Sequence, residues 1–291
     1  MTRIPTKILI AYDGSSCAKA AMEDLRHAGL GFKIKAKVIS VSDPWVPPIE
    51  SLSVATDVMF AGAYAMTLGQ ARNTLKEVKA LAVEGAAHLR KIFPEWDIST
   101  ATAMDSPAQG ILHVAEKWKP GLIVMGSQGH TALGGFLLGS VSHKVLTHAV
   151  CNVRIARLSS GRDLAPRILL AVDGSKDAEA MLKGVANRVW VNGAEFRVVV
   201  VLDYRLSLIQ NFPQRIAEQA ESILAERGLK VTAALRDGDP REEIIREVKR
   251  FKASSLFVGS RGLHAVQRFF LGSVSAALAE RAPCAVEVVR R

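Results

Sequence analysis

Short apolar runs alternate along the chain with longer segments in which apolar residues recur every three or four positions. Runs of four to eight such residues are typical of buried strands, and the longer periodic segments are typical of helices. This alternation predicts an α/β fold in which a parallel sheet is covered on both faces. Strands are expected at residues 8–12, 35–41, 98–104, 122–125, 153–158, 168–172, 196–202, 231–235, 256–258 and 285–289. Helices are expected at residues 17–28, 64–93, 108–118, 141–148, 213–227, 241–251 and 274–281.

The chain contains the same unit twice. The segment KILIAYDGS at 7–15 returns as RILLAVDGS at 167–175, an offset of 160 residues. A later block, 124–142, returns at 257–275 with an offset of 133, so the first copy carries 27 additional residues. We therefore expect a first domain over residues 1–158 with an insertion at about 44–70, a linker at 159–166, and a second domain over 167–291.

The insertion allows two interpretations. It contains two consecutive prolines, Pro47 and Pro48, and has no charged residue between Asp57 and Arg72. One interpretation is a loop and a helix that pack on their own domain. The other is a lid or an oligomer contact, because loops of this kind often carry function.

Composition describes a globular protein of the cytoplasm. Hydrophobic residues make up 49% and charged residues 23% of the 291 residues, which excludes disordered and collagen-like classes. The uncharged stretch 58–71 is shorter than the roughly 20 residues of a membrane span, so no membrane association is expected. The three cysteines contain no C-x-x-C pair, and the N-terminus lacks the pattern of a secretion signal, which favours a reducing cytoplasm.

The positive charge is spread evenly. The net charge is +10, and each half contributes +5, from 17 basic against 12 acidic residues in 1–160 and 21 against 16 in 161–291. Without a basic tail or interleaved aromatic residues, this distribution argues against nucleic acid as a partner.

Each copy carries a glycine-rich loop with the spacing Gly-x2-Gly-x9-Gly-Ser. The loop directly follows a predicted strand and directly precedes a predicted helix, so its backbone N–H groups can close on a phosphate at a helix N-terminus. Ser140 and Ser142 stand where a hydroxyl caps the helix or donates to a phosphate oxygen. The alternative is a tight turn without a ligand. The loop residues are Gly126, Gly129, Gly139 and Ser140 in the first copy and Gly259, Gly262, Gly272 and Ser273 in the second.

An aspartate ends the first strand of each copy. Asp13 and Asp173 lie at the carboxyl end of a predicted parallel strand, where ligands of open α/β sheets bind. Such an acid suits a ribose hydroxyl or a metal; a turn or helix-cap role is the alternative, because Gly-Ser follows each aspartate. Since a carboxylate would repel a polyphosphate, we expect Mg²⁺ between the two, held by Asp13 or Asp173.

These motifs make the chain resemble the universal stress protein family in its tandem form, over nearly the whole sequence except residues 44–66. The resemblance implies two doubly wound, five-stranded parallel sheets of strand order 3-2-1-4-5, of the adenine nucleotide alpha hydrolase type. It further implies ATP as ligand, because members of the nucleotide-binding branch hold ATP with a strand-end Asp and this glycine loop. By this resemblance the first site comprises Asp13, Val41, Gly126, Gly129, Gly139, Ser140, Val141 and Ser142, and the second comprises Asp173, Val201, Gly259, Gly262, Gly272, Ser273, Val274 and Ser275.

The two predicted sites are not identical. Arg261 in the second loop stands opposite Gln128 in the first, and Leu263 stands opposite His130. We count Arg261 and His130 as candidate ligand contacts, although an exposed loop histidine is the alternative for His130. The two sites are therefore expected to differ in affinity or in ligand.

The expected function is ATP-dependent regulation rather than catalysis. The sequence has no Gly-Lys dipeptide, hence no Walker A loop, and no G-x-G-x-x-G, H-E-x-x-H or G-x-S-x-G motif. We predict a stress-response sensor that acts through nucleotide occupancy on a protein partner, which the sequence does not identify, or on its own assembly. The alternatives are a slow ATP hydrolase or phosphotransferase, and a binder of a different ligand through residues 44–70.

The last strand of each copy predicts how the halves meet. Residues 153–158 and 285–289 are apolar and would otherwise leave open sheet edges with unpaired backbone groups. We expect the halves to pack through these strands as an intramolecular pseudo-dimer with the ATP crevices outside, an arrangement that also allows a homodimer.

Overall fold

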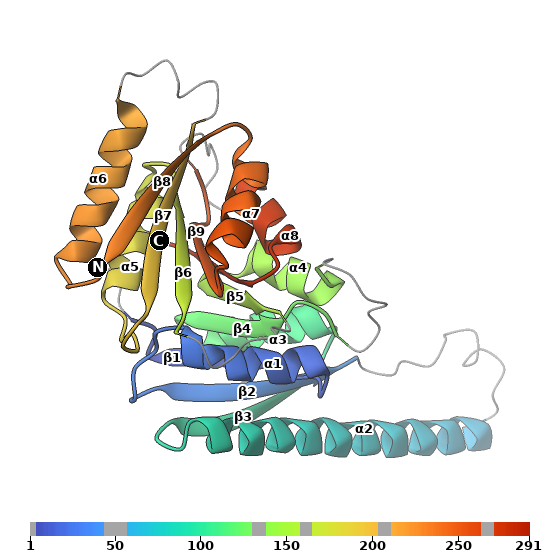
Figure 1. Ribbon diagram of the computed structural model, residues 1–291. Helices are drawn as coiled ribbons and strands as arrows, with labels where there is room; N and C mark the ends of the chain where they lie inside the picture. Colours follow the sequence, from blue (N-terminus) through green and yellow to red (C-terminus); the bar gives the residue numbers. More distant parts are fainter. Residues whose placement is uncertain (1–3, 44–56, 130–137, 158–164, 203–210, 263–270) are drawn as a thin grey trace.

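The computed structural model describes residues 4–43, 57–129, 138–157, 165–202, 211–262 and 271–291 (Figure 1). Strand and helix alternate through both halves, as the hydrophobic pattern predicts. The first half contains β1 (Lys7–Ala11), α1 (Ser16–Asp24), the 3-10 helix Leu25–His27, β2 (Lys35–Ser42), α2 (Asp57–Ile92), β3 (Asp97–Met104), α3 (Pro107–Trp118), β4 (Leu122–Gly126), α4 (Ser140–His148) and β5 (Asn152–Ala156). The second half contains β6 (Arg167–Val172), α5 (Lys176–Ala186), β7 (Glu195–Leu202), α6 (Phe212–Ala225), β8 (Val231–Asp237), α7 (Pro240–Phe251), β9 (Ser255–Gly259), α8 (Ser273–Arg281) and β10 (Ala285–Val289).

All ten strands form one mixed sheet. Its order is β3-β2-β1-β4-β5-β10-β9-β6-β7-β8, so each half is parallel and has the predicted order 3-2-1-4-5. The α/β fold class is confirmed, but the two expected sheets are joined, because β5 and β10 pair antiparallel with Val153 opposite Val288 and Ile155 opposite Val286. These are the strands whose open edges the sequence indicated. Because this pairing is antiparallel, the strands of the first half end on the side of the sheet where the strands of the second half begin.

Apolar side chains of the strands alternate between the two faces of the sheet. In β1, Ile8 and Ile10 pack towards α1 and α2, whereas Leu9 packs on the opposite face. The face that carries α3, α4, α7 and α8 holds one hydrophobic cluster to which both halves contribute, including Val153 of β5 and Val286 of β10. The halves therefore share a core, which ties them together more firmly than a linker alone.

Helix α2 incorporates part of the predicted insertion. It begins at Asp57 rather than near residue 64, and it packs on β2 and β3. Figure 1 shows its N-terminal end reaching beyond the other elements of the first half. Residues 44–56 and most of the predicted linker at 159–166 lie outside the described residues, so the roles and boundaries proposed for them stay predictions.

A buried cluster of charges lies at the junction of the halves. The side chains of Arg154 in β5 and Glu287 in β10 have no exposed surface, and they face each other across the strand pair. Arg154 also donates to both carboxylate oxygens of Asp24, from Nε at 2.6 Å and from Nη2 at 3.1 Å. Glu287 also forms an ion pair with Arg188. Burial alone would lower the pKa of Arg154, but Asp24 and Glu287 raise it above its ordinary value. Two cations and two anions thus compensate each other's charge, and of the four side chains only Asp24 is partly exposed.

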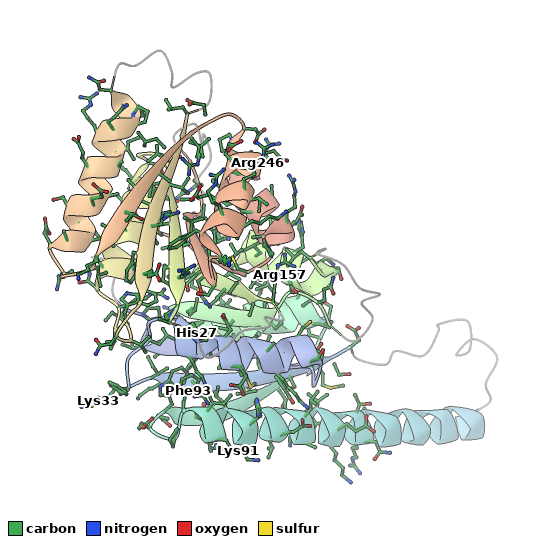
Figure 2. The ribbon with its side chains drawn as sticks, viewed as in Figure 1. His27, Lys33, Lys91, Phe93, Arg157 and Arg246 are labelled. Carbon is green, nitrogen blue, oxygen red and sulfur yellow. The ribbon has the colours of Figure 1, made fainter. Side chains whose placement is uncertain are left out.

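Two further arginines join each half to a helix of the other half. Arg157, which follows β5, donates to the carbonyls of Ala279 and Glu280 at the end of α8, at 2.6 and 2.7 Å. Arg290, which follows β10, donates to the carbonyl of Leu146 near the end of α4. A cation at a helix C-terminus is stabilised by the helix dipole. Figure 2 shows Arg157 at the junction of the halves.

The first prediction concerns the buried carboxylate. Glu287→Gln leaves the two buried arginines, Arg154 and Arg188, with a single carboxylate, Asp24, so the free energy of unfolding should fall by about 3–5 kcal/mol. Arg281→Ala is the control, because its ion pair with Glu242 is about half exposed and should contribute less than about 1 kcal/mol. Urea denaturation of both variants measures the difference. Equal stabilities would show that the junction does not depend on this charge.

Candidate functional site

The sequence Asp-Gly-Ser forms the same turn after the first strand of each half. Gly14 and Gly174 adopt a φ of 82°, which a residue with a side chain rarely adopts. This turn lets the N–H of Ser15 donate to Oδ1 of Asp13 at 3.0 Å, and the N–H of Ser175 donate to Oδ1 of Asp173 at 2.9 Å. One oxygen of each aspartate therefore holds the turn, which is the structural role that the sequence left open.

The other oxygen of each aspartate faces the glycine loop. A Cβ atom at Gly129 would lie 2.8 Å from Oδ2 of Asp13, and one at Gly262 would lie 2.7 Å from Oδ2 of Asp173. Any side chain at these glycines would displace the carboxylate. The structure thus brings the predicted strand-end aspartate and the predicted loop together in both halves.

The glycine loop returns to the sheet where the next helix starts. The N–H of Gly139 donates to the carbonyl of Ser127, and the N–H of Gly272 donates to the carbonyl of Ser260, each at 2.8 Å. Gly139 and Gly272 are the N-cap residues of α4 and α8. Because glycine has no side chain, both helices start without a side-chain cap, whereas Ser15 and Ser175 cap α1 and α5. The N-cap residues of α4 and α8 therefore leave the first-turn N–H groups available to a different acceptor, such as a ligand.

The two serines of each helix start take different roles. The buried hydroxyl of Ser142 donates to the carbonyl of Gly126 at 2.9 Å, and that of Ser275 donates to the carbonyl of Gly259 at 2.7 Å. A hydroxyl has one proton, so these side chains can only accept further hydrogen bonds. Ser140 and Ser273 are exposed, and their role as donors to a ligand stays a prediction.

Gly126 and Gly259 are required by packing inside the protein. A Cβ atom at Gly126 would lie 2.8 Å from the backbone of Cys17 in α1, and one at Gly259 would lie 3.0 Å from the backbone of Asp177 in α5. The sequence ascribed these glycines to the approach of a phosphate. The structure adds a second reason for them, the close packing of a helix on a strand end.

The valines carried over by resemblance lie at or near this edge of the sheet. Val41 is near the end of β2 and Val201 near the end of β7. Val141 and Val274, in the first turns of α4 and α8, pack against the shared core. His130 and Leu263 lie outside the described residues.

Arg261 binds a residue that the sequence analysis did not single out. Its guanidinium group holds both carboxylate oxygens of Asp177, at 2.9 and 3.2 Å, and Ser260 donates to the same carboxylate at 2.7 Å. A comparison of the two copies at the offset of 160 could have indicated Asp177, because Asp177 corresponds to Cys17 of the first copy.

Two of the three free cysteines are poor nucleophiles at neutral pH. Burial raises the pKa of Cys151 to about 11 and that of Cys284 to about 12. Reactivity requires the thiolate, so neither residue is a candidate for covalent catalysis. Their positions at the ends of buried strands agree with a packing role.

One carboxylate per site restricts the metal chemistry. Among the described residues, no group of three or more His, Cys, Asp or Glu side chains is placed to hold a metal ion. Mg²⁺ commonly takes one or two protein carboxylates together with water and phosphate oxygens. The site thus fits a cation shared with a phosphate-bearing ligand rather than a metal held by the protein alone.

Comparison with known proteins identifies the family. The model of the universal stress protein family matches residues 5–157 and again residues 165–290. The chain belongs to the universal stress protein family. A putative universal stress protein of Staphylococcus epidermidis is 34% identical over 140 residues, which is 42% of this chain and 82% of that protein. A relative from Staphylococcus aureus is 33% identical over the same shares.

Solved structures show the same tandem architecture. A universal stress protein from Archaeoglobus fulgidus superposes with a TM-score of 0.71 at 24% identity, covering 98% of both chains. A protein of unknown function from Pseudomonas aeruginosa superposes with a TM-score of 0.65 at 16% identity, covering 99% of this chain and 94% of that one. At these identities the likeness establishes the fold. In the described part of this universal stress protein, no helix is long and apolar enough to cross a membrane.

The second prediction separates the two serines. Ser142→Ala removes the donor to the buried carbonyl of Gly126 and should lower the free energy of unfolding by about 1–2 kcal/mol. Ser140→Ala changes an exposed side chain and should stay within about 0.5 kcal/mol of the parent protein. Chemical denaturation measures both. A larger loss for Ser140→Ala than for Ser142→Ala would contradict the assignment.

Proposed function

We propose that this universal stress protein binds ATP at the carboxyl ends of the strands in each half and acts as a sensor that responds to whether nucleotide is bound. The observation that carries the proposal is the convergence of three elements in both halves. In each half a strand-end carboxylate lies so close to the glycine loop that a Cβ atom of the loop glycine would be within 3 Å of it, and the helix that follows the loop has a glycine N-cap. Backbone N–H groups at such a helix start favour phosphate.

The residues divide by the part of the nucleotide that they suit. The N–H groups of the loop and of the first turn of α4, together with the hydroxyl of Ser140, suit the phosphates. The carboxylate of Asp13 suits a ribose hydroxyl or a cation, and Val41 suits the adenine ring. Asp173, Ser273 and Val201 take the same roles in the second half.

Magnesium belongs to this proposal as a companion of the phosphates. When bound, it would neutralise phosphate charge next to Asp13 or Asp173. Without it, a single carboxylate beside a triphosphate would oppose binding. ATP affinity should therefore depend on the cation.

A sensor accounts for the site better than an enzyme. Phosphoryl transfer needs a positioned base or water-orienting group and usually an arginine at the transferred phosphate. The second loop contains Arg261 and Arg268; of these, Arg261 lies in the described residues and is held by Asp177. We infer that occupancy is read by a protein partner or by assembly with a second copy, in the cytoplasm.

The third prediction tests ATP binding. Gly139→Val with Gly272→Val places side chains where the helix start meets the loop, so ATP binding measured by calorimetry should disappear. Gly31→Val is the control, because a Cβ atom there has nothing within 4 Å. Circular dichroism verifies that both variants are folded. Unchanged ATP affinity in the folded double variant would remove the loop from the proposed site.

The fourth prediction tests sensor against enzyme. With Mg²⁺ and no partner, phosphate release should be far below the roughly 1–100 per second of kinases. Nucleotide released by heating the purified protein should then be largely ATP rather than ADP. A turnover within that range would make the protein an ATP hydrolase or phosphotransferase instead.

A further inference from the structure

The second loop is tied to the helix beneath it. Asp177 lies in the first turn of α5, and only 6% of its side chain is exposed. Its carboxylate accepts hydrogen bonds from both arms of Arg261 and from the hydroxyl of Ser260. The hydroxyl of Ser175 adds a bond to the carbonyl of Arg261 at 3.2 Å. Two consecutive loop residues are thus anchored on α5 by side chains.

The first loop has different chemistry at the equivalent positions. Cys17 replaces Asp177, and Gln128 replaces Arg261, by the offsets of 160 and 133 that relate the copies. A thiol and an amide cannot form a charge-assisted, two-armed hydrogen bond. The neighbouring residue types are the same, since Ser15, Ser127 and the glycines of the first copy correspond to Ser175, Ser260 and the glycines of the second.

Net charge does not distinguish the pair Asp177 and Arg261 from the pair Cys17 and Gln128, although the second loop also contains Arg268 where the first contains Gly135. The formal charges of Asp177 and Arg261 cancel, and Cys17 and Gln128 have no formal charge. The difference is mechanical: a loop fixed in its bound conformation loses less conformational freedom when a ligand binds.

We propose that Asp177 is a positioning residue that holds the second loop ready for phosphate, so that the second site binds ATP more tightly than the first. This inference rests on the proposed function. Arg261 serves as the anchor of the loop and not as a phosphate ligand. Moving Arg261 to a phosphate would leave the carboxylate of Asp177 buried without its partner, which is costly.

The decisive variant is Asp177→Asn in a Gly139→Val background, where only the second site binds. Loss of the anchor should weaken the affinity for ATP with Mg²⁺ about tenfold. If Arg261 instead contacted phosphate, the same change would free Arg261 and remove a negative charge near the ligand. Binding would then become tighter, and an equal or tighter affinity overturns the inference.

A matched control removes the same charge elsewhere in the same half. Glu195 forms an exposed ion pair with Arg167. It is the first residue of β7 and so lies at the opposite end of the strand from the site. Glu195→Gln in the same background should leave ATP affinity unchanged. A tenfold loss with this control too would show that Asp177→Asn acts through net charge, which overturns the inference.

The residues that differ between the two copies can also be swapped. Asp177→Cys with Arg261→Gln should reduce the second site to the affinity of the first. Cys17→Asp with Gln128→Arg, in a Gly272→Val background, should bring the first site towards the second. Failure of the first exchange to weaken binding contradicts the positioning role.

Hydrogen exchange without nucleotide separates this inference from the proposed function. Amides of residues 259–262 should exchange more slowly than those of residues 126–129, and Asp177→Asn should remove the difference. Equal exchange in the parent protein overturns the inference whatever ATP does. If exchange is unequal but no ATP binds, Asp177 does hold the second loop, but the proposed ATP site and the affinity difference are both wrong.

Discussion

The buried ion cluster at the junction determines how the ten strands come together. Arg154 and Glu287 occupy equivalent positions of the two copies, 133 residues apart, and carry opposite charges. If two first halves met through β5 in this register, Arg154 would face Arg154 without water to screen the repulsion. The charges therefore favour the pairing of a first half with a second half over that of two identical halves.

The junction and the candidate sites share two helices. Arg157 and Arg290 bind the C-terminal carbonyls of α8 and α4, and the N-termini of the same two helices face the sites. Each helix is therefore held at one end by the opposite half and contributes its other end to the glycine loop of its own half. Assembly of the halves thereby supports the geometry on which phosphate binding would depend.

The elements could be predicted from the sequence because each signal is local. The continuous apolar run in 7–11 and the glycine at the end of β4 can be recognised without a fold, and the repeat marks both copies at once. The strand order came from the family resemblance, not from periodicity. The start of α2 at Asp57 was missed, because the helical pattern was followed only from residue 64, although Thr56 and Asp57 are residue types that favour a helix start.

The sequence by itself determined the fold class, the duplication and the residues that gather at each carboxyl edge, since these follow from spacing along the chain. Only the tertiary structure decided what those residues do. In the folded protein the hydroxyl of Ser142 donates to the carbonyl of Gly126. Arg261 pairs with Asp177, and Arg154 pairs with Glu287. Such contacts join positions from 16 to 133 residues apart, and their geometry depends on how helices and strands pack, which no local pattern encodes.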